Sequence, residues 1–310
     1  MQKEESIFYS SCPACESLSI RKVLTAKDYT VSNQPFEVWE CGNCTLRFTQ
    51  GIPVEQQIGK YYQSDNYISH SNTSKGLINK LYLLARNTTL SLKKRLIHKE
   101  TGGQKGNLLD IGAGTGAFAS YMKAQRWNVT GLEPDAAARE NAKQLHDISL
   151  QPVEELFQLP AGHFQVITLW HVLEHVHQLH ANIEQIKKLL SNEGVLFIAV
   201  PNYTSYDAAV YREYWAAYDV PRHLYHFSPS SMRIFLSSHG LRLKRVRPMW
   251  FDSYYVSLLS EKYKTGKASL LKGYWYGSLS NLKTIFNKEK SSSLIYVIVK
   301  RETTDVRRQM

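Results

Sequence analysis

The chain has 310 residues, of which 43% are hydrophobic, 21% charged and 12% aromatic, and its formal net charge is +11. This composition is typical of globular proteins and excludes the disordered, collagen-like and coiled-coil classes. The length allows two domains of about 150 residues each. No apolar stretch of the sequence approaches the roughly 20 residues of a membrane-spanning helix. The acidic start, Met1–Ile7, does not fit a secretory signal, so a cytoplasmic location is expected.

The positive charge is concentrated in two segments. Residues 75–105 carry a net charge of +7 and residues 241–310 one of +10, whereas the remainder of the chain is negative. Such blocks suit an anionic partner, and three classes of partner fit: a small or nucleotide-linked molecule, a nucleic acid and an acidic membrane surface. The alternative is that this charge only keeps the protein in solution.

All four cysteines lie in the first 44 residues, as two C-x2-C pairs: Cys12, Cys15, Cys41 and Cys44. Two such turns can place four sulfurs around one tetrahedral zinc ion, and Gly42 offers the second turn backbone freedom. In a reducing compartment a metal is favoured over structural disulfides or inert thiols. Four thiolates close the coordination shell, so the zinc is expected to be structural and not catalytic.

The N-terminal third divides into two parts. Residues 1–60 are predicted to form a zinc-ribbon-like module, in which Ile20–Leu24 and Phe36–Trp39 are short strands. Residues 61–105 are predicted to be a basic helical linker or lid, with one or two amphipathic helices between Gly76 and Lys99. The apolar side of these helices either packs on the next domain or lies on a membrane surface.

From residue 106 to the C-terminus, strand and helix patterns alternate. This alternation predicts an α/β domain with a doubly wound parallel sheet. Segments 201–228 and 250–292 are predicted to be insertions on the substrate side. The predicted strands are Asn107–Ile111, Asn128–Leu132, Ile148–Val153, Phe164–Leu169, Gly194–Val200, Leu241–Val246 and Leu294–Lys300. The predicted helices are Thr115–Gln125, Asp135–Leu145, His177–Leu190 and one that begins at Ser228-Pro229 and ends at Gly240.

A glycine-rich loop follows the first of these strands and contains Gly112, Gly114 and Gly116. Glycines at this turn let a ligand approach the backbone, and the next helix begins beside it. Glu133, at the end of the next strand, is placed to hold the hydroxyls of a ribose. The glycines also fit the dinucleotide pattern G-x-G-x-x-A. Asp110 argues against that pattern, because its carboxylate opposes a pyrophosphate but suits a cationic amino-acid end.

This loop resembles that of the class I methyltransferases, which use S-adenosyl-L-methionine. Their motif D-x-G-x-G-x-G is matched by Asp110 and the three glycines, and the resemblance covers about residues 61–310. It implies a seven-stranded Rossmann-like methyltransferase fold. Gln165 departs from the family, in which an acid is common before the fourth strand. The cofactor-binding residues that the resemblance implies are Asp110, Gly112, Gly114, Gly116, Glu133, Pro134, Val153 and His171.

His171, Glu174 and His175 also fit H-x-x-E-H, the inverted zinc-protease motif. That motif needs both histidines on one helical face and a distant third ligand, whereas His171 follows a buried strand within a methyltransferase pattern. The methyltransferase interpretation is therefore favoured. Within it, His171 either lines the cofactor pocket or only packs.

A second group of candidate residues lies between the fifth strand and the next helix, where loops at the carboxyl ends of parallel strands carry ligand sites. Arg222 can bind a carboxylate or phosphate, and His223 or His226 is a candidate general base. Together with the cysteine pairs, Tyr61-Tyr62 and Tyr67, this segment resembles zinc-ribbon methyltransferases encoded among bacterial surface-polysaccharide and secondary-metabolite genes.

The sequence therefore predicts methyl transfer from S-adenosyl-L-methionine to a small or nucleotide-linked acceptor, with a sugar or glycan precursor favoured. Two alternatives remain open. An RNA methyltransferase would use the ribbon and the basic segments to contact phosphates, and its affinity for RNA would fall steeply with salt. A non-catalytic recruitment module would bind the cofactor but transfer no methyl group.

Overall fold

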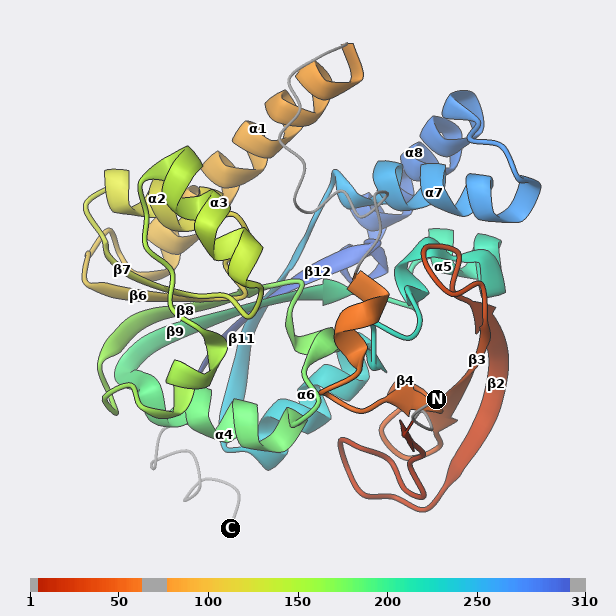
Figure 1. Ribbon diagram of the computed structural model, residues 1–310, viewed down its shortest axis with the longest axis horizontal. Coiled ribbons are helices and arrows are strands. Elements are labelled where there is room, and N and C mark those ends of the chain that lie inside the picture. Colours follow the sequence, from red (N-terminus) through yellow and green to blue (C-terminus); the bar gives the residue numbers. More distant parts are fainter. Residues whose placement is uncertain (1–4, 63–76, 302–310) are drawn as a thin grey trace. The chain divides into compact units, whose positions relative to one another are not determined.

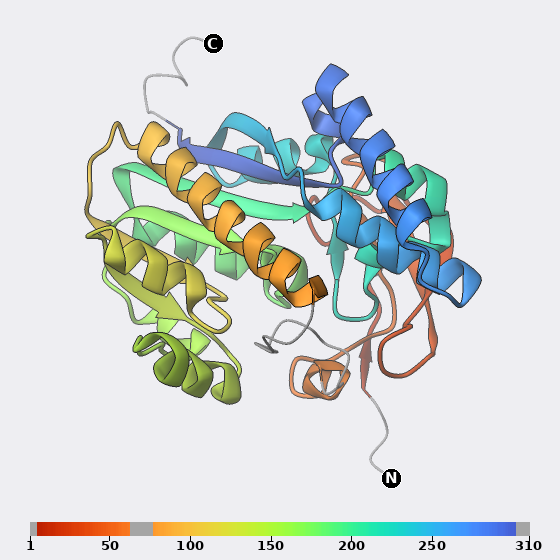
Figure 2. The same ribbon diagram turned by 90° about the horizontal axis from the view of Figure 1, so that it is seen from above.

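The computed structural model describes residues 5–62 and 77–301 (Figures 1 and 2). Tyr67 of the sequence pattern lies outside the described residues. The chain forms two compact units, each made of segments that are separated in the sequence. Within the described residues, the first unit comprises residues 5–62, 171–182 and 199–297, and the second comprises residues 77–170, 183–198 and 298–301.

The N-terminal ribbon is part of the first unit. Its strands are β1 (Ser6–Ile7), β2 (Ile20–Lys27), β3 (Pro35–Cys41), β4 (Arg47–Thr49) and β5 (Ile52–Pro53), and β10 (Tyr225–His226) joins them from the second half of the chain. β2 and β3 form the predicted hairpin, which is antiparallel from Ile20 opposite Cys41 to Lys27 opposite Pro35. In the described residues the main ribbon sheet has the order β10-β4-β3-β2. The sequence did not predict the added strand β10.

The ribbon shares an apolar core with the segment that follows β9. Ala26 of β2 and Val38 of β3 are buried in one cluster with Tyr211, Trp215 and Val220. The ribbon hairpin and the predicted substrate-side insertion 201–228 therefore exclude water together, and neither buries these side chains alone.

The second unit contains the glycine loop and the strands around it. β6 (Asn107–Ile111) pairs in parallel with β7 (Asn128–Leu132) and with β8 (Phe164–Trp170). Leu108, Leu109 and Ile111 are almost completely buried, as expected for a parallel strand covered on both faces.

These strands belong to a sheet with the order β11-β12-β9-β8-β6-β7, which confirms the predicted doubly wound α/β architecture. Across residues 5–62 and 77–301 this sheet has six strands and not the predicted seven. Segment Ile148–Val153 contributes only an isolated bridge between Gln151 and Leu132, because Pro152 cannot donate to a strand partner and a 3-10 helix follows it. The other strands are β9 (Leu190–Pro201), β11 (Leu241–Pro248) and β12 (Ser293–Lys300).

The helices agree with the sequence pattern where capping residues were visible. Ser228 accepts a hydrogen bond from Ser231 N and forms a capping box at the start of α6, with Pro229 in the first turn. Asp135 caps α3 in the same way by accepting from Ala138 N. None of the described helices is both long and apolar enough to cross a membrane.

The α-helices are α1 (Leu77–Glu100), α2 (Ala117–Ala124), α3 (Ala136–His146), α4 (Leu179–Leu189), α5 (Tyr206–Tyr211), α6 (Pro229–Ser238), α7 (Asp252–Thr265) and α8 (Leu270–Phe286). The 3-10 helices are η1 (Ile58–Tyr62), η3 (Val153–Phe157), η4 (Leu173–His175), η5 (Arg212–Tyr214), η6 (Ala216–Tyr218) and η7 (Lys288–Lys290).

A buried carboxylate joins the C-terminal elements of the first unit. Asp207 of α5 has no solvent exposure and accepts hydrogen bonds from Trp215 Nε1, Ser280 Oγ and Ser292 Oγ at 2.7–2.8 Å. Hydrogen bonds to a buried charge are stronger than neutral ones, so this residue fixes α5 against α8 and the start of β12.

Candidate functional site

The glycine-rich loop joins β6 to α2. Gly112, Gly114 and Gly116 all have positive φ angles, between 55° and 75°. Residues other than glycine rarely adopt such angles. A Cβ atom at Gly116 would lie 2.8 Å from Ile148 Cγ2, whereas a Cβ atom at Gly114 would meet nothing within 4 Å. Gly116 is therefore required for packing, and Gly114 leaves open space beside the backbone in which a ligand can lie.

Glu133 follows β7 and is held against this loop. One carboxylate oxygen accepts a hydrogen bond from Gly114 N at 2.8 Å, and the other accepts one from Asp135 N at 3.1 Å. Arg139 donates to the carbonyl oxygens of Glu133 and Pro134 and so fixes the turn. A carboxylate at the end of the second strand is the usual acceptor for ribose hydroxyls.

Asp110, near the end of β6, is the buried acid of the same loop. Its carboxylate accepts a hydrogen bond from Thr168 Oγ1 at 2.6 Å. Burial raises the pKa of Asp110 to about 7, while the Thr168 hydrogen bond and the charge of Lys93 oppose the rise and Glu133 adds to it. A cationic ligand group would stabilise the ionised form. The open glycine turn, Glu133 and Asp110 thus fit the ribose and the cationic amino-acid end of S-adenosyl-L-methionine.

The other predicted cofactor residues differ in their surroundings. Pro134 is exposed after β7, and Val153 begins η3 in the second unit. His171 lies in the first unit, where its ring nitrogens are 3.4 Å from Glu174 Oε1 and 3.2 Å from Asp252 Oδ2. Burial would lower the His171 pKa, but these two carboxylates outweigh it and raise the pKa to about 10. His171 is therefore a cation at neutral pH.

The four cysteines converge as the sequence predicts. Their sulfurs all lie within 4.8 Å of one another, and Cys12–Cys44 and Cys15–Cys41 Sγ separations are 3.5 and 3.6 Å. Sulfurs around a tetrahedral zinc ion with bonds of about 2.3 Å are about 3.8 Å apart, so the cluster fits the metal, whereas a disulfide needs about 2.05 Å.

The two cysteine turns have the same local form. Glu16 and Thr45, the residues after each pair, both have positive φ angles, and their backbone N–H groups donate to Cys12 O and Cys41 O. Gly42 does not have a positive φ angle, so the prediction that it supplies unusual backbone freedom is wrong. A Cβ atom at this position would lie 2.6 Å from Ser19 Oγ, so the Ser19 side chain would have to rotate.

A second cluster brings together Glu174, His175 and His223, each offering a ligand atom within 4.8 Å of the others. His223 Nδ1 lies 2.9 Å from Ala217 O, and His175 Nδ1 lies 3.0 Å from Arg222 O. Because a carbonyl oxygen only accepts, both Nδ1 atoms carry a proton. Burial and the nearby His223 lower the His175 pKa to about 4, so His175 is neutral.

Glu174 is the buried acid of this cluster. It has no solvent exposure, and neither carboxylate oxygen has a well-oriented hydrogen bond within the described structure; its ion pair is with His171. Two imidazoles and a carboxylate form a donor set that can bind a divalent metal or, without one, receive a proton from a bound molecule.

Arg222 lies beside this cluster but is itself completely buried. Its Nη2 donates to Asp28 at 3.1 Å and to Asp219 at 2.6 Å, its Nε donates to Asp219 at 3.0 Å, and its Nη1 donates to Tyr61 O at 2.9 Å. Burial opposes the ionisation of both acids, but Arg222, with the Ser32 backbone N–H at Asp28, lowers both carboxyl pKa values. The guanidinium thus forms ion pairs with two carboxylates of the protein itself.

His226 occupies a different environment from His223. Thr49 Oγ1 donates its proton to His223 O at 2.7 Å, so the 3.1 Å contact between Thr49 Oγ1 and His226 Nε2 requires that Nε2 be the donor. Burial, with the neighbouring charges of His223 and Arg47, lowers the His226 pKa well below its usual value.

A family model for a methyltransferase domain matches residues 83–246, which is more than half of the chain. The chain belongs to this methyltransferase family. It is similar to proteins named ubiquinone biosynthesis O-methyltransferase from Acinetobacter baumannii (28% identical over 176 residues, 52% of this chain and 74% of the relative) and Acinetobacter baylyi (30% over the same length and shares). Among solved structures it resembles a SAM-dependent methyltransferase from Archaeoglobus fulgidus (TM-score 0.48, 16% identity, 70% of this chain and 94% of the other).

This methyltransferase uses S-adenosyl-L-methionine.

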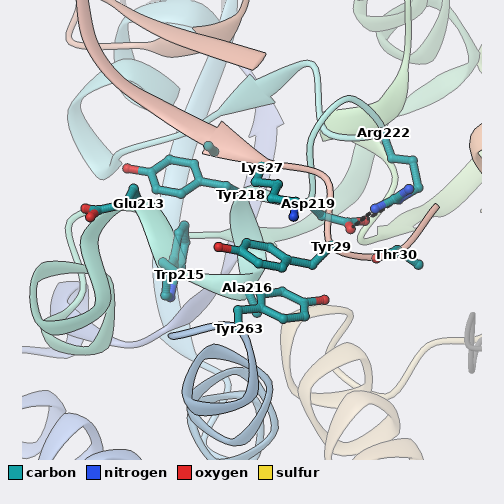
Figure 3. A pocket seen from close by; sticks show the side chains of 11 residues that line it. Lys27, Tyr29, Thr30, Glu213, Trp215, Ala216, Tyr218, Asp219, Arg222 and Tyr263 are labelled. Carbon is teal, nitrogen blue, oxygen red and sulfur yellow. Dashed lines mark hydrogen bonds and ion pairs between the residues drawn. The ribbon is translucent and has the colours of Figure 1, made fainter. Parts of the chain in front are cut away.

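The first unit contains a small pocket (Figure 3). Tyr29 and Tyr263 stack at 4.3 Å between ring centroids at the pocket. The Asp219–Arg222 ion pair lies at its wall. The lining residues are Ala26, Lys27, Tyr29, Thr30, Glu213, Trp215, Ala216, Tyr218, Asp219, Arg222 and Tyr263.

Sequence reasoning did not assign roles to Glu174, His175, Asp219 or Asp28. The H-x-x-E-H segment was the available signal for Glu174 and His175, and it was interpreted as a protease motif or as part of the methyltransferase segment that borders the cofactor. Their partner His223 comes much later in the chain, after β9 and α5, and no local pattern links the two segments.

Replacing Arg222 with alanine is expected to lower the free energy of unfolding by about 3–5 kcal/mol, because Asp28 and Asp219 would remain as buried charges without their partner. Arg222→Lys should also be destabilised, since an ammonium cannot replace the two-pronged contact with Asp219. Urea unfolding followed by circular dichroism measures the change. Arg21→Ala, which removes an exposed pair with Glu40, is the control and should cost less than about 1 kcal/mol. An Arg222→Ala midpoint equal to that of the wild type would contradict this assignment.

Proposed function

We propose that the chain transfers the methyl group of S-adenosyl-L-methionine to a hydroxyl of a small-molecule acceptor, and that His223 takes up the hydroxyl proton. The observation that carries this proposal is the orientation of His223. Its Nδ1–H is fixed by Ala217 O, so Nε2 is the ring nitrogen that takes up a proton, and the ring belongs to the cluster with His175 and Glu174. The carboxylate of Asp219 lies 3.9 Å from the same Nε2 atom.

In the transfer step, the acceptor O–H bond breaks and its proton passes to His223 Nε2. The acceptor oxygen forms a bond to the methyl carbon, and the electron pair of the broken C–S bond stays on sulfur. The cofactor supplies an already activated methyl group, so the protein contributes alignment and proton removal. The carboxylates of Asp219 and Glu174 lie beside the ring that receives this proton.

The residues that hold the cofactor in this proposal are those of the glycine loop and its acids. Asp110 binds the cationic amino-acid end of the cofactor, and Glu133 binds its ribose. The backbone at Gly112 and Gly114 lets the cofactor approach closely. Pro134, Val153 and His171 complete the proposed set as the resemblance implies.

Two earlier candidates receive different roles in this proposal. Arg222 is a positioning residue and not an acceptor-binding one, because each of its three nitrogens already donates to Asp28, Asp219 or Tyr61 O. His226 is structural, since its Nε2–H is used by Thr49. Lys27, which is exposed at the pocket, supplies positive charge for an anionic acceptor instead.

The acceptor that we favour is a nucleotide-linked sugar or glycan precursor. The exposed ammonium of Lys27 suits a phosphate of such an acceptor. The named relatives make an aromatic hydroxyl the second candidate.

The four cysteines are proposed to hold one structural zinc ion. Their separations fit its coordination, and β3, which carries Cys41, lies in the ribbon sheet. The metal would stabilise the ribbon against which the 203–220 segment packs.

Binding of S-adenosyl-L-methionine should depend on Glu133 and on the ionisation of Asp110. Glu133→Ala is expected to weaken binding by tenfold or more, whereas exposed Glu140→Ala should not change it. Because the Asp110 pKa is about 7 and a cationic ligand favours the ionised form, affinity should rise with pH by up to tenfold per unit below pH 7 and level off above it. Calorimetric titration between pH 5.5 and 7.5 measures both effects. A pH slope that survives in Asp110→Asn would rule out Asp110 as its source.

Replacing His223 with alanine should lower kcat by about 10²- to 10⁴-fold while leaving the affinity for S-adenosyl-L-methionine unchanged. Transfer of tritiated methyl to a panel of nucleotide sugars and a panel of phenols identifies the acceptor class and provides the rate. The exposed His163→Ala is the control, and added imidazole should restore part of the lost activity in His223→Ala. Treatment with EDTA distinguishes proton transfer from metal catalysis, because a base needs no divalent ion at this cluster. Full activity of His223→Ala would refute the proposed base.

The purified protein should contain one zinc ion per chain by atomic emission spectroscopy. Cys41→Ser should lose the metal and melt at a lower temperature, because structural zinc binding contributes directly to folding. Ser11→Ala, next to the first cysteine pair, is the matched control. A mass two units below that of the reduced chain for each cysteine pair, with no metal, would instead indicate disulfides.

A further inference from the structure

Helix α8 has an unusual distribution of side chains. Its buried positions are the small residues Gly273, Gly277, Ser280 and Thr284. These positions repeat at intervals of three and four and therefore form one face of the helix. Figures 1 and 2 both show α7 and α8 side by side.

The small-residue face lies directly against the backbone of α7. A Cβ atom at Gly273 would lie 2.9 Å from Leu258 Cα, and one at Gly277 would lie 2.9 Å from Tyr254 Cα. No larger side chain fits between the two helices at these points. The rotation of α8 about its axis is therefore fixed, and its large residues have to lie on the opposite side.

That opposite side is apolar and exposed. Leu271, Trp275, Leu282 and Phe286 follow one another at spacings of four, seven and four residues, which places them in a single stripe. Their exposed fractions run from 48% for Leu282 to 86% for Leu271, and Tyr274 and Ile285 flank the stripe with 68% and 64%. Contiguous apolar surface of this kind marks an interaction site.

The charged residues of α8 and of the chain just before it are of one sign. Residues 262–288 contain six lysines and no aspartate or glutamate, and each of these lysines is exposed: Lys262, Lys264, Lys267, Lys272, Lys283 and Lys288. Leucine, phenylalanine and tryptophan on one side of a helix, with lysines around them, is the pattern of helices that lie in the surface of an anionic membrane.

We propose that the exposed face of α8 docks on the surface of an anionic lipid bilayer. Leu271, Trp275, Leu282 and Phe286 enter the boundary between headgroups and acyl chains, and the lysines contact lipid phosphates. A second copy of the chain is disfavoured as the occupant, because a symmetric contact would bring the same six lysines face to face. This surface is separate from the proposed acceptor site, and the inference does not depend on the proposed function.

The test is flotation of the full chain with vesicles of phosphatidylcholine alone or of phosphatidylcholine mixed with phosphatidylglycerol. Binding is expected to the anionic vesicles, and it should weaken as salt concentration rises. The double variant Leu271→Ser, Phe286→Ser should bind at least tenfold more weakly. The control Leu18→Ser removes a residue of similar exposure (81%) and should bind as the wild type does. Lys272→Gln with Lys283→Gln should reduce the preference for phosphatidylglycerol.

Fluorescence quenching by brominated lipid locates the contact. Quenching should be seen in the wild type and be largely lost in Trp275→Phe. All variants should retain their affinity for S-adenosyl-L-methionine, which confirms that they are folded. The proposal is overturned if the double variant floats as well as the wild type or if the wild type does not bind anionic vesicles. It is also overturned if sedimentation shows a dimer that the double variant abolishes, since the occupant is then a second copy.

Discussion

A buried arginine holds the first unit together. Taking the guanidinium of Arg222 out of water carries a cost of several kcal/mol, which only close opposite charges and hydrogen bonds can offset. The partners are Asp28 after β2, the carbonyl of Tyr61 in η1, and Asp219 three residues earlier. Three segments far apart in the sequence must therefore meet at one point. The carbonyl of Arg222 also accepts from His175 Nδ1, so the constraint that satisfies the charge also orients a histidine of the candidate site.

The two candidate sites are built in different ways, and this explains which of them the sequence revealed. The glycine loop, Asp110 and Glu133 are close together in the sequence and belong to two adjacent parallel strands and the turns after them, so their proximity follows from local pattern and sheet topology. His175, His223 and Asp28 come together only through tertiary packing. Residue type suggested Arg222 as a ligand for an anion, but burial and pairing decide that role, and neither can be read from composition.

Other differences from the predictions also have physical causes. The cap at Ser228 and the ribbon hairpin were predictable, because they depend on neighbouring residues. The strand at Ile148–Val153 was not realised, and Pro152, which ends its pairing, was a signal against it in the sequence itself. Gly42 was predicted for its backbone freedom, whereas its φ angle is not positive and its close neighbour is the Ser19 side chain. In α8, apolar periodicity normally predicts a buried face, yet the two glycines against α7 turn that face outward.

The pairing of β10 with β4 has a consequence for how the protein is made. Tyr225 lies opposite Phe48, so the ribbon leaves the ribosome long before the strand that completes its sheet. During that interval the edge of β4 presents unpaired backbone groups, which is the arrangement through which nascent chains join one another incorrectly. Early capture of a metal by the cysteine turns would hold the hairpin in shape, but only the arrival of β10 closes the edge. The edge of β4 thus stays exposed until late in synthesis. The yield of folded protein in cells should therefore respond to translation speed and to chaperones that cover open strands.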